Sequence, residues 1–95
     1  MKQSFVYIMA SPSHKTYIGV TTDLERRVWE HRTKQTDGHT NQYNKVHLVY
    51  IEEFAHIGDA IAREKQLKRW SSVKKEILIE RANAHWLDLS ADWYR

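Results

Sequence analysis

The sequence predicts a single small α/β domain, spanning residues 1–95, in which a three-stranded antiparallel sheet is flanked by helices in the order ββαβαα. Two short β-branched and aromatic segments on either side of a turn predict a hairpin. A later segment of the same kind predicts a third strand, and three segments with apolar residues at helical spacing predict helices. Ninety-five residues support one compact core rather than two domains.

The hairpin strands are predicted at Phe5–Ala10 and Lys15–Thr21. Between them, Ser11–His14 contains the only proline of the chain and is typical of a turn. Two strands joined by so short a connection must run antiparallel.

Two tyrosines of this hairpin are expected on the same face of the sheet, because side chains alternate between the faces along a strand. A hairpin symmetric about Pro12 would place Tyr7 opposite Tyr17, with Gly19 leaving open backbone beside the phenols. The alternative is that these tyrosines only pack a half-buried sheet.

The first helix is predicted to begin at a capping box formed by Thr22 and Glu25, and to run to about Lys34. At about 100° per residue, one narrow sector that should face the sheet contains an arginine and a histidine. Its members are Leu24, Arg27, Val28 and His31. Solvated arginines normally lie on the opposite face, although the stem of Arg27 could cross the apolar surface and leave its head in water.

The remaining elements follow a polar loop at residues 35–44, in which no role is assigned to His39. Lys45–Phe54 is the best third strand. Two helices, Ile57–Trp70 and Ser72–Arg81, are separated near Ser71. The tail from residue 83 to 95 is expected to form a short helix or turn that packs on the body through its apolar side chains, Trp86, Leu87, Leu89 and Trp93.

The least ordinary residue is Glu64, which lies near the middle of the apolar arc of the second helix. The other members of that arc are Ile57, Ala60, Ile61 and Leu67. A carboxylate in an apolar stripe is costly unless it is paired or binds a cation. The alternative to a metal site is a structural ion pair with Arg27 or with a neighbouring lysine.

Taken together, a pair of phenols, a guanidinium, an imidazole and a carboxylate are expected to converge on one side of the sheet. Such a set suits phosphoryl transfer. A hard divalent cation can be held by one carboxylate with substrate phosphate and water, and it lowers the pKa of bound water. An arginine matches phosphate oxygens, and a phenol or imidazole can remove a proton from the attacking water.

These residues also carry a resemblance to the GIY-YIG nuclease superfamily. The segments VYIMAS and TYIGVTTDLERRVWEH resemble its signature, with the two strand motifs reading Phe5-Val6-Tyr7 and Tyr17-Ile18-Gly19. The resemblance continues at LVYIEEF and at AIAREKQLKRW, and it extends over nearly the whole chain. It is nearest to the small stand-alone bacterial members. Phe5 replaces the glycine that opens the first motif and adds bulk near the site.

The resemblance implies a role for each matching residue. Tyr7 and Tyr17 match the motif tyrosines, of which the first is the proposed general base. Arg27 matches the essential arginine, and His31 matches a histidine that supports the base.

Outside these motifs, Glu64 matches the metal-binding glutamate, which implies Mg²⁺ or Mn²⁺ as cofactor. Asn83 is a looser match to a C-terminal asparagine, and Lys15 is a possible activator of the phenol. The resemblance therefore implies a metal-dependent endonuclease that hydrolyses phosphodiester bonds in DNA. The small surface favours recognition of DNA structure over a long sequence.

Composition agrees with this interpretation without requiring it. The net charge is +3 and the pI about 9.3, which permits a polyanionic partner. Candidate DNA contacts are Arg26, Arg32, Lys65, Lys68 and Arg69, which could equally be ordinary solvated residues. The absence of cysteine excludes disulfides and thiolate metal sites. No signal peptide or membrane segment is apparent, so a cytoplasmic protein is expected, with no small-molecule cofactor.

Two other functions remain open. The chain could be a nucleic-acid-binding module with little or no turnover that needs an unidentified protein partner. It could also be a structural or protein-interaction domain, although the tail tryptophans are better explained by core packing. A zinc site is not supported, since the six histidines show no ligand-like spacing.

Overall fold

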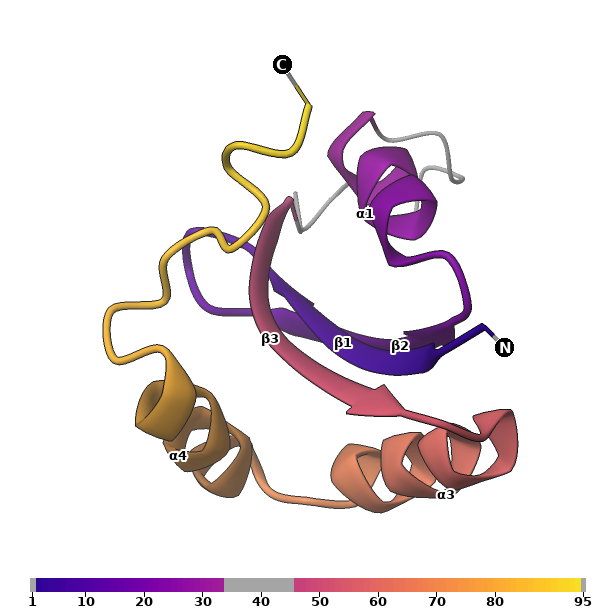
Figure 1. Cartoon of the computed structure of the whole chain (residues 1–95). Helices are drawn as coiled ribbons and strands as arrows, with labels where there is room; N and C mark the ends of the chain where they lie inside the picture. Colours follow the sequence, from indigo (N-terminus) through magenta and orange to yellow (C-terminus); the bar gives the residue numbers. More distant parts are fainter. Residues whose placement is uncertain (1, 34–45, 95) are drawn as a thin grey trace.

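A computed structural model describes residues 2–33 and 46–94 and confirms the predicted α/β class. Three antiparallel strands form one sheet in the order β2-β1-β3. Helix α1 covers one face, and helices α3 and α4 cover the other (Figure 1). The strands are β1 (Ser4–Ala10), β2 (Thr16–Thr21) and β3 (His47–Phe54), and the helices are α1 (Leu24–Thr33), α3 (Ile57–Lys68) and α4 (Ser72–Ala82).

The boundaries differ little from those predicted. Strand β2 begins at Thr16, one residue later than expected, and helix α3 ends at Lys68, with Arg69 as its C-cap. The predicted loop at residues 35–44, the end of the first helix at Lys34 and the start of the third strand at Lys45 lie outside the described residues. In the part of the chain that the structure describes, no helix is long and apolar enough to cross a membrane.

The predicted register of the hairpin is wrong. Ala10 pairs with Thr16, so the hairpin is centred on Ser13 rather than on Pro12. The turn is closed by the backbone N–H of Ser11, which donates to the carbonyl of Lys15 at 2.9 Å. This shift of one residue in the centre moves every pairing by two residues and therefore keeps each side chain on its predicted face.

The N-terminus of α1 is also capped differently from the prediction. Asp23, not Thr22, is the capping residue: its carboxylate accepts a hydrogen bond from the backbone N–H of Arg26 at 3.3 Å. The backbone N–H of Asp23 in turn donates to the hydroxyl of Thr21 at 3.0 Å. The helix consequently starts at Leu24, two residues after the predicted cap.

A β-bulge in β3 decides which side chains face each helix layer. Ile8 pairs with Tyr50 and Met9 with Leu48, which leaves Val49 as the extra residue. Val49 and Tyr50 therefore both face α3 and α4, whereas Leu48 faces α1.

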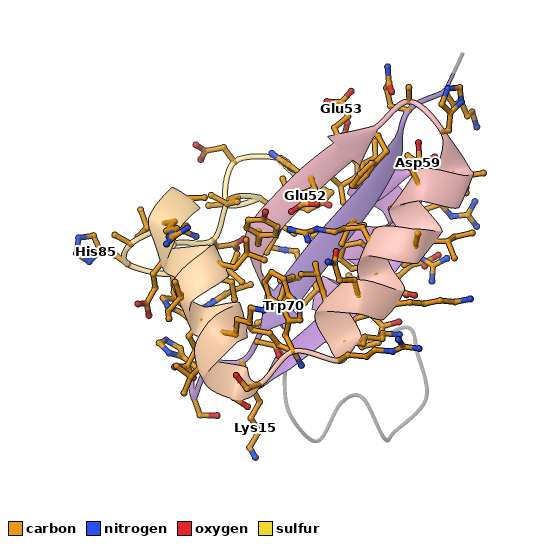
Figure 2. All side chains as sticks on the ribbon, turned by 90° about the horizontal axis from the view of Figure 1, so that it is seen from below. Lys15, Glu52, Glu53, Asp59, Trp70 and His85 are labelled. Atoms are coloured by element: carbon orange, nitrogen blue, oxygen red, sulfur yellow. The ribbon has the colours of Figure 1, made fainter. Side chains whose placement is uncertain are left out.

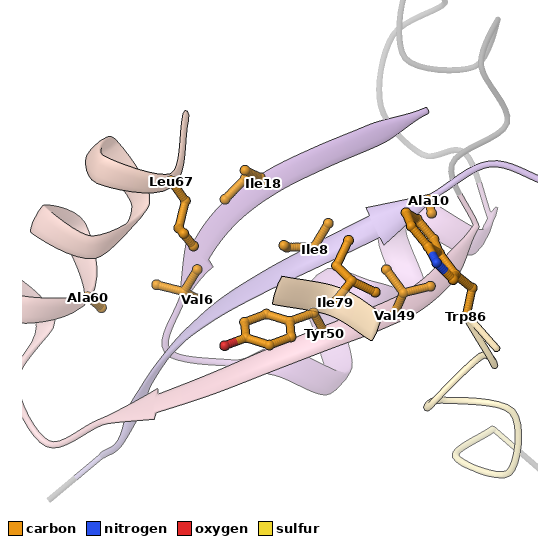
Figure 3. Close-up of a cluster of buried hydrophobic side chains, with 10 residues drawn as sticks. All are labelled: Val6, Ile8, Ala10, Ile18, Val49, Tyr50, Ala60, Leu67, Ile79 and Trp86. Atoms are coloured by element: carbon orange, nitrogen blue, oxygen red, sulfur yellow. The ribbon is translucent and has the colours of Figure 1, made fainter. Parts of the chain in front are cut away.

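The sheet separates two hydrophobic clusters of different size. The larger lies beneath the sheet and contains Val6, Ile8, Ala10, Ile18, Val49, Tyr50, Ala60, Leu67, Ile79 and Trp86 (Figure 3). The smaller lies under α1 and contains Tyr7, Met9, Val28 and Leu48. Burial of these apolar side chains is the main stabilising contribution to such a small domain.

The predicted apolar face of α3 is only half correct. Ala60 and Leu67 are fully buried, but Ile57 is 45% exposed and Ile61 is 40% exposed. The helix is rotated so that Arg63 and Glu64 flank the buried line instead. Arg63 and Glu64 are both partly buried, and each forms an ion pair, with Glu52 and Lys68 respectively.

The tail after α4 forms turns, as predicted, and passes the β3 edge to reach the α1 face (Figure 1). Asn83 is buried and donates to the carbonyls of Val49 at 3.1 Å and Leu87 at 2.9 Å. Trp86 is buried, but Leu87 is 63% exposed, so the predicted packing holds for only part of the tail.

Further along, the tail is fixed to α1 through an ion pair. The guanidinium of Arg32 lies 2.6 Å from the carboxylate of Asp88 and also donates to the hydroxyl of Ser90 at 3.2 Å. Asp88 accepts from the backbone N–H of Leu48 at 3.1 Å, which connects the tail to β3 as well. The last turn of α1 and the first residues of β3 are thus held by the same carboxylate.

Candidate active site

A tyrosine and a histidine are hydrogen-bonded in the layer between the sheet and α1. The hydroxyl of Tyr7 lies 3.1 Å from Nε2 of His31, and the two residues are 1% and 8% exposed. The ring of Tyr17 lies 6.2 Å from that of Tyr7 and 4.9 Å from that of His31, measured between centroids. The structure therefore brings together three of the predicted site residues.

Glycine is required beside this group because of a close approach. Tyr7 pairs with Gly19, not with Tyr17, and its ring lies over the glycine. A Cβ atom at position 19 would lie 2.5 Å from the hydroxyl oxygen of Tyr7. The expected open backbone at Gly19 is thus wrong, since the phenol occupies that space.

Arg27 lies on the same helix as His31, one turn earlier. Its side chain is 47% exposed, and its Nε lies 3.4 Å from the carboxylate of Glu30. The alternative of a stem crossing the surface with its head in water describes this residue better than burial in the apolar stripe. Its positive charge is near enough to favour the ionised form of Tyr7.

The environment of Tyr7 opposes ionisation of the phenol. Burial raises the pKa of Tyr7 above its ordinary value of 10.0, and the neighbouring Tyr17 raises it further. The charge of Arg27 lowers it in part. A free phenolate is therefore disfavoured at neutral pH, and a proton can leave Tyr7 easily only if a neighbouring base accepts it.

Glu64 lies beneath the sheet, so the expected convergence of all five groups on one side is wrong. α1 and Tyr7 belong to one layer, whereas α3 packs through Ala60 and Leu67 on the opposite face. The carboxylate of Glu64 is paired with Nζ of Lys68 at 3.3 Å, as the alternative interpretation anticipated for a neighbouring lysine.

The rotation of α3 nevertheless directs Glu64 toward the free edge of β2. On a helical projection, Arg63 and Glu64 lie about 50° on either side of the line through Ala60 and Leu67. Arg63 points toward β3, because it bonds to Glu52 of that strand. Glu64 therefore points toward the other side, where β2 ends the sheet. Tyr17 belongs to β2 and packs with the cluster under α1, so Tyr17 and Glu64 border this edge from opposite faces of the sheet.

The donors present fit a metal that needs few protein ligands. Within residues 2–33 and 46–94, no three side chains of His, Cys, Asp or Glu are close enough to form a cluster for a metal ion. Mg²⁺ is commonly held by one or two carboxylates, with substrate phosphate and water completing the shell. Glu64, half-buried with a side chain 20% exposed, suits such a site.

The looser site predictions fall elsewhere. The side-chain amide of Asn83 is fully engaged, since it donates twice and accepts from the backbone N–H of Leu87 at 2.9 Å. Lys15 lies in the β1–β2 turn and lines a hollow with Ser72 and Lys75 of α4. These contacts indicate a structural role for Asn83, and the role of Lys15 as an activator of a phenol stays a prediction.

The predicted DNA contacts divide into two groups. Arg32 is bonded to the tail, and Lys68 is paired with Glu64, so both have structural partners. Arg26 has a side chain that is 76% exposed, although it pairs with Glu30 at 3.4 Å. Lys65 on α3 and Arg69 at its C-cap are exposed. These three residues are available to an anionic ligand.

A second phenol network beneath the sheet was not predicted. Tyr50 donates a short hydrogen bond to Glu52, whose carboxylate also accepts from Nε and a terminal nitrogen of Arg63 at 2.9 and 3.0 Å. The Trp70 ring is in contact with two cations, the Cζ of Arg63 at 5.2 Å and the Nζ of Lys74 at 4.3 Å from a ring centroid. Glu52 and Trp70 lie between α3 and α4 (Figure 2). The feature of the sequence that could have indicated this network is Arg63, a cation next to Glu64 on the same helix.

This network is electrostatically closed. Although burial opposes ionisation, hydrogen bonds from Arg63 and Tyr50 hold the pKa of Glu52 below its ordinary value. Burial and the bond to Glu52 raise the pKa of Tyr50 to about 12. The carboxylate of Glu52 and the guanidinium of Arg63 are paired with each other, so the network is best explained as a structural anchor for α3.

Comparison with known proteins identifies the relatives of this fold. Residues 3–76 match the family described as the GIY-YIG catalytic domain. A UPF0213 protein of Haloquadratum walsbyi is 37% identical over 76 residues, which cover 80% of this chain and 85% of the relative. A UPF0213 protein of Staphylococcus haemolyticus is 32% identical over 80 residues, covering 84% and 98%.

A solved structure agrees with the same assignment. The solution NMR structure of a UPF0213 protein from Bacillus halodurans superimposes with a TM-score of 0.59 and 25% sequence identity. The alignment covers 95% of this chain and 97% of that protein. The similarity therefore extends to the tail, beyond the residues that the family match covers.

Proposed function

Because the chain belongs to the GIY-YIG catalytic-domain family, whose members are nuclease-type hydrolases, we propose that it is a metal-dependent endonuclease that cleaves phosphodiester bonds in DNA. The single observation that carries the proposal is the 3.1 Å contact between the Tyr7 hydroxyl and Nε2 of His31. It provides a phenol with a base positioned to accept its proton.

The proton path follows from the burial of Tyr7. An attacking water gives a proton to the phenol oxygen as the phenol gives its own proton to Nε2 of His31. No free phenolate accumulates, so the raised pKa of Tyr7 does not prevent the reaction. This path requires the tautomer of His31 in which Nε2 carries no proton.

Two charged residues supply the remaining requirements. Arg27 lies one helical turn from His31 with a solvent-accessible head, so its guanidinium can pair with a phosphate oxygen as charge develops. Glu64 is the residue that would hold Mg²⁺ or Mn²⁺, with Lys68 released from its ion pair. The bound ion would polarise the phosphate and stabilise the leaving oxygen.

DNA is the proposed substrate, with recognition of its structure rather than its sequence. A domain of 95 residues offers little surface for reading a long site. The exposed residues Arg26 on α1, Lys65 on α3 and Arg69 at the C-cap of α3 provide positive charge for contact with phosphates.

The test is cleavage of supercoiled plasmid and of branched oligonucleotide duplexes in Mg²⁺. The wild type should nick the DNA, and Glu64→Gln should abolish cleavage. Asp59→Asn is the matched control, because Asp59 is an exposed carboxylate on the same helix. Equal product patterns for wild type and Glu64→Gln would refute the proposal. Binding without cleavage, unaffected by EDTA, would identify a nucleic-acid-binding module instead.

A further inference from the structure

A hollow of about 530 Å³ lies on the α1 face of the sheet, next to the Tyr7 group. It is lined by Phe5 of β1, by the first turn of α1 with the residues that precede it, and by Trp93 of the tail. The lining residues are Phe5, Thr22, Asp23, Leu24, Glu25 and Trp93. None of the roles assigned above uses it.

Its position relative to the site is fixed by the strand. Phe5 and Tyr7 are two residues apart on β1, so their side chains project from the same face about 7 Å apart. Phe5 pairs with Thr21 at the end of the hairpin, from which the chain enters α1. A ligand held against Phe5 is therefore a neighbour of one held at Tyr7.

The far wall of the hollow is held in place by the tail. The hydroxyl of Tyr94 donates to the backbone carbonyl of Glu25 at 2.6 Å, which ties the tail to the first turn of α1. The backbone N–H of Trp93 donates to the carbonyl of Ser90 at 3.1 Å. Phe5 and Trp93 are both only partly buried, so each presents ring surface to the hollow.

Acidic residues line the hollow, and basic residues follow them along α1 outside it. Asp23 and Glu25, which only accept hydrogen bonds as carboxylates, line it. Arg26 and Arg27 follow directly and lie outside it. A ligand that fits this order has an apolar ring with hydrogen-bond donors in the hollow, and a negative charge beside the arginines.

We infer that the hollow receives one unpaired base of the DNA substrate, next to the phosphate that is cleaved. A nucleotide has the required polarity: a flat ring that stacks on aromatic side chains, donor groups on the ring edge, and an anionic phosphate at the other end. Paired bases are stacked within the duplex and cannot enter. This inference rests on the proposed function and assigns its substrate class, DNA with an unpaired nucleotide.

The experiment measures binding rather than cleavage, in EDTA. Fluorescence anisotropy compares a labelled duplex that carries one unpaired adenosine with the same duplex fully paired. The wild type should bind the first about fivefold more tightly or better, as stacking of one base on aromatic side chains would give. The ratio should approach one in Trp93→Leu and in Phe5→Leu, and should persist in Trp93→Phe.

Leu87→Ala serves as the control, because Leu87 is an exposed tail residue outside the hollow. It should leave the ratio unchanged. Equal affinity of the wild type for both duplexes, or a ratio that neither Trp93→Leu nor Phe5→Leu alters, would overturn the inference. Failure of the nuclease proposal is distinguishable, since it appears as absent cleavage in Mg²⁺ while the binding ratio persists.

Discussion

Two buried tyrosines, one on each face of the sheet, show how the same side chain serves different ends. Beneath the sheet, Tyr50 donates to a carboxylate that Arg63 neutralises. Above it, the hydroxyl of Tyr7 meets the imidazole of His31, which can exchange a proton. Beneath the sheet, the ion pair between Glu52 and Arg63 stabilises the charged carboxylate, so Glu52 is a poor acceptor for the proton of Tyr50. The pair above has a proton to move and a guanidinium with an exposed head nearby.

The difference in function between the two tyrosines is tested most sharply by removing each hydroxyl in turn. Tyr7→Phe should reduce the rate of DNA cleavage about 100-fold or more, because a proton-transfer group is lost. Tyr50→Phe should leave that rate within about twofold of wild type. Single-turnover cleavage in Mg²⁺ measures both. Equal rates in the two variants would show that the two phenols do not differ in function.

Gly19→Ala tests the close packing of the upper phenol. The added Cβ would lie 2.5 Å from the hydroxyl oxygen of Tyr7, so the ring must shift from its position beside His31. We expect a loss of about 1–3 kcal/mol in the free energy of unfolding, and a loss of activity larger than that destabilisation explains. Urea denaturation and cleavage rates would be measured together. Gly58→Ala is the control, because nothing lies near a Cβ at that position.

Arg63→Met tests the lower network. Removing the guanidinium leaves Glu52 half-buried without its main partner, so the free energy of unfolding should fall by about 2 kcal/mol at pH 7. The pKa of Glu52 is lowered in the folded state, so its contribution is present above about pH 4.5 and is lost as the pH falls through the lowered value. The difference between the two proteins should therefore shrink in acid. A constant difference from pH 7 to pH 3 would contradict this assignment.

The smallest expected effect appears at high pH. Tyr7 and Tyr50 both have a pKa raised above 10.0, so the stability that their protonated forms contribute is complete below pH 10 and is lost as the pH rises further. Absorbance of the phenolates should show Tyr7 and Tyr50 ionising late, above the ordinary pKa of 10.0. The Phe variants identify each late component, and early ionisation of Tyr7 would contradict its burial.

Much of this architecture could be predicted because local patterns determine it. The two tyrosines alternate onto one face whatever the register, so an error in the hairpin centre left Tyr7 beside Tyr17 and His31. The bulge at Val49 could not be predicted, because nothing local requires it. It places Glu52 beneath the sheet, and with it the partner of Arg63.

The side of the sheet on which α3 packs was the other feature that the sequence left open. Periodicity placed Glu64 within an apolar arc, but it does not say which face of the sheet that arc covers, since the connection from β3 can turn either way. Ile57 and Ile61 are exposed, so the apolar pattern alone does not fix how the helix is rotated. The observed rotation turns Arg63 toward β3, where it bonds to Glu52, and Glu64 toward β2. Only the strand order makes β2 an edge that both layers share.

The proposed endonuclease site requires that a metal ion held by Glu64 lies at the β2 edge, close to the phenols of Tyr17 and Tyr7 on the other face of the sheet. Titration with Mn²⁺, followed by paramagnetic broadening of the aromatic side-chain NMR signals, tests it most directly. We expect the ring signals of Tyr17 and Tyr7 to broaden before those of Tyr50, and Glu64→Gln to abolish the effect. Broadening that starts at Tyr50, or that survives Glu64→Gln, would contradict it.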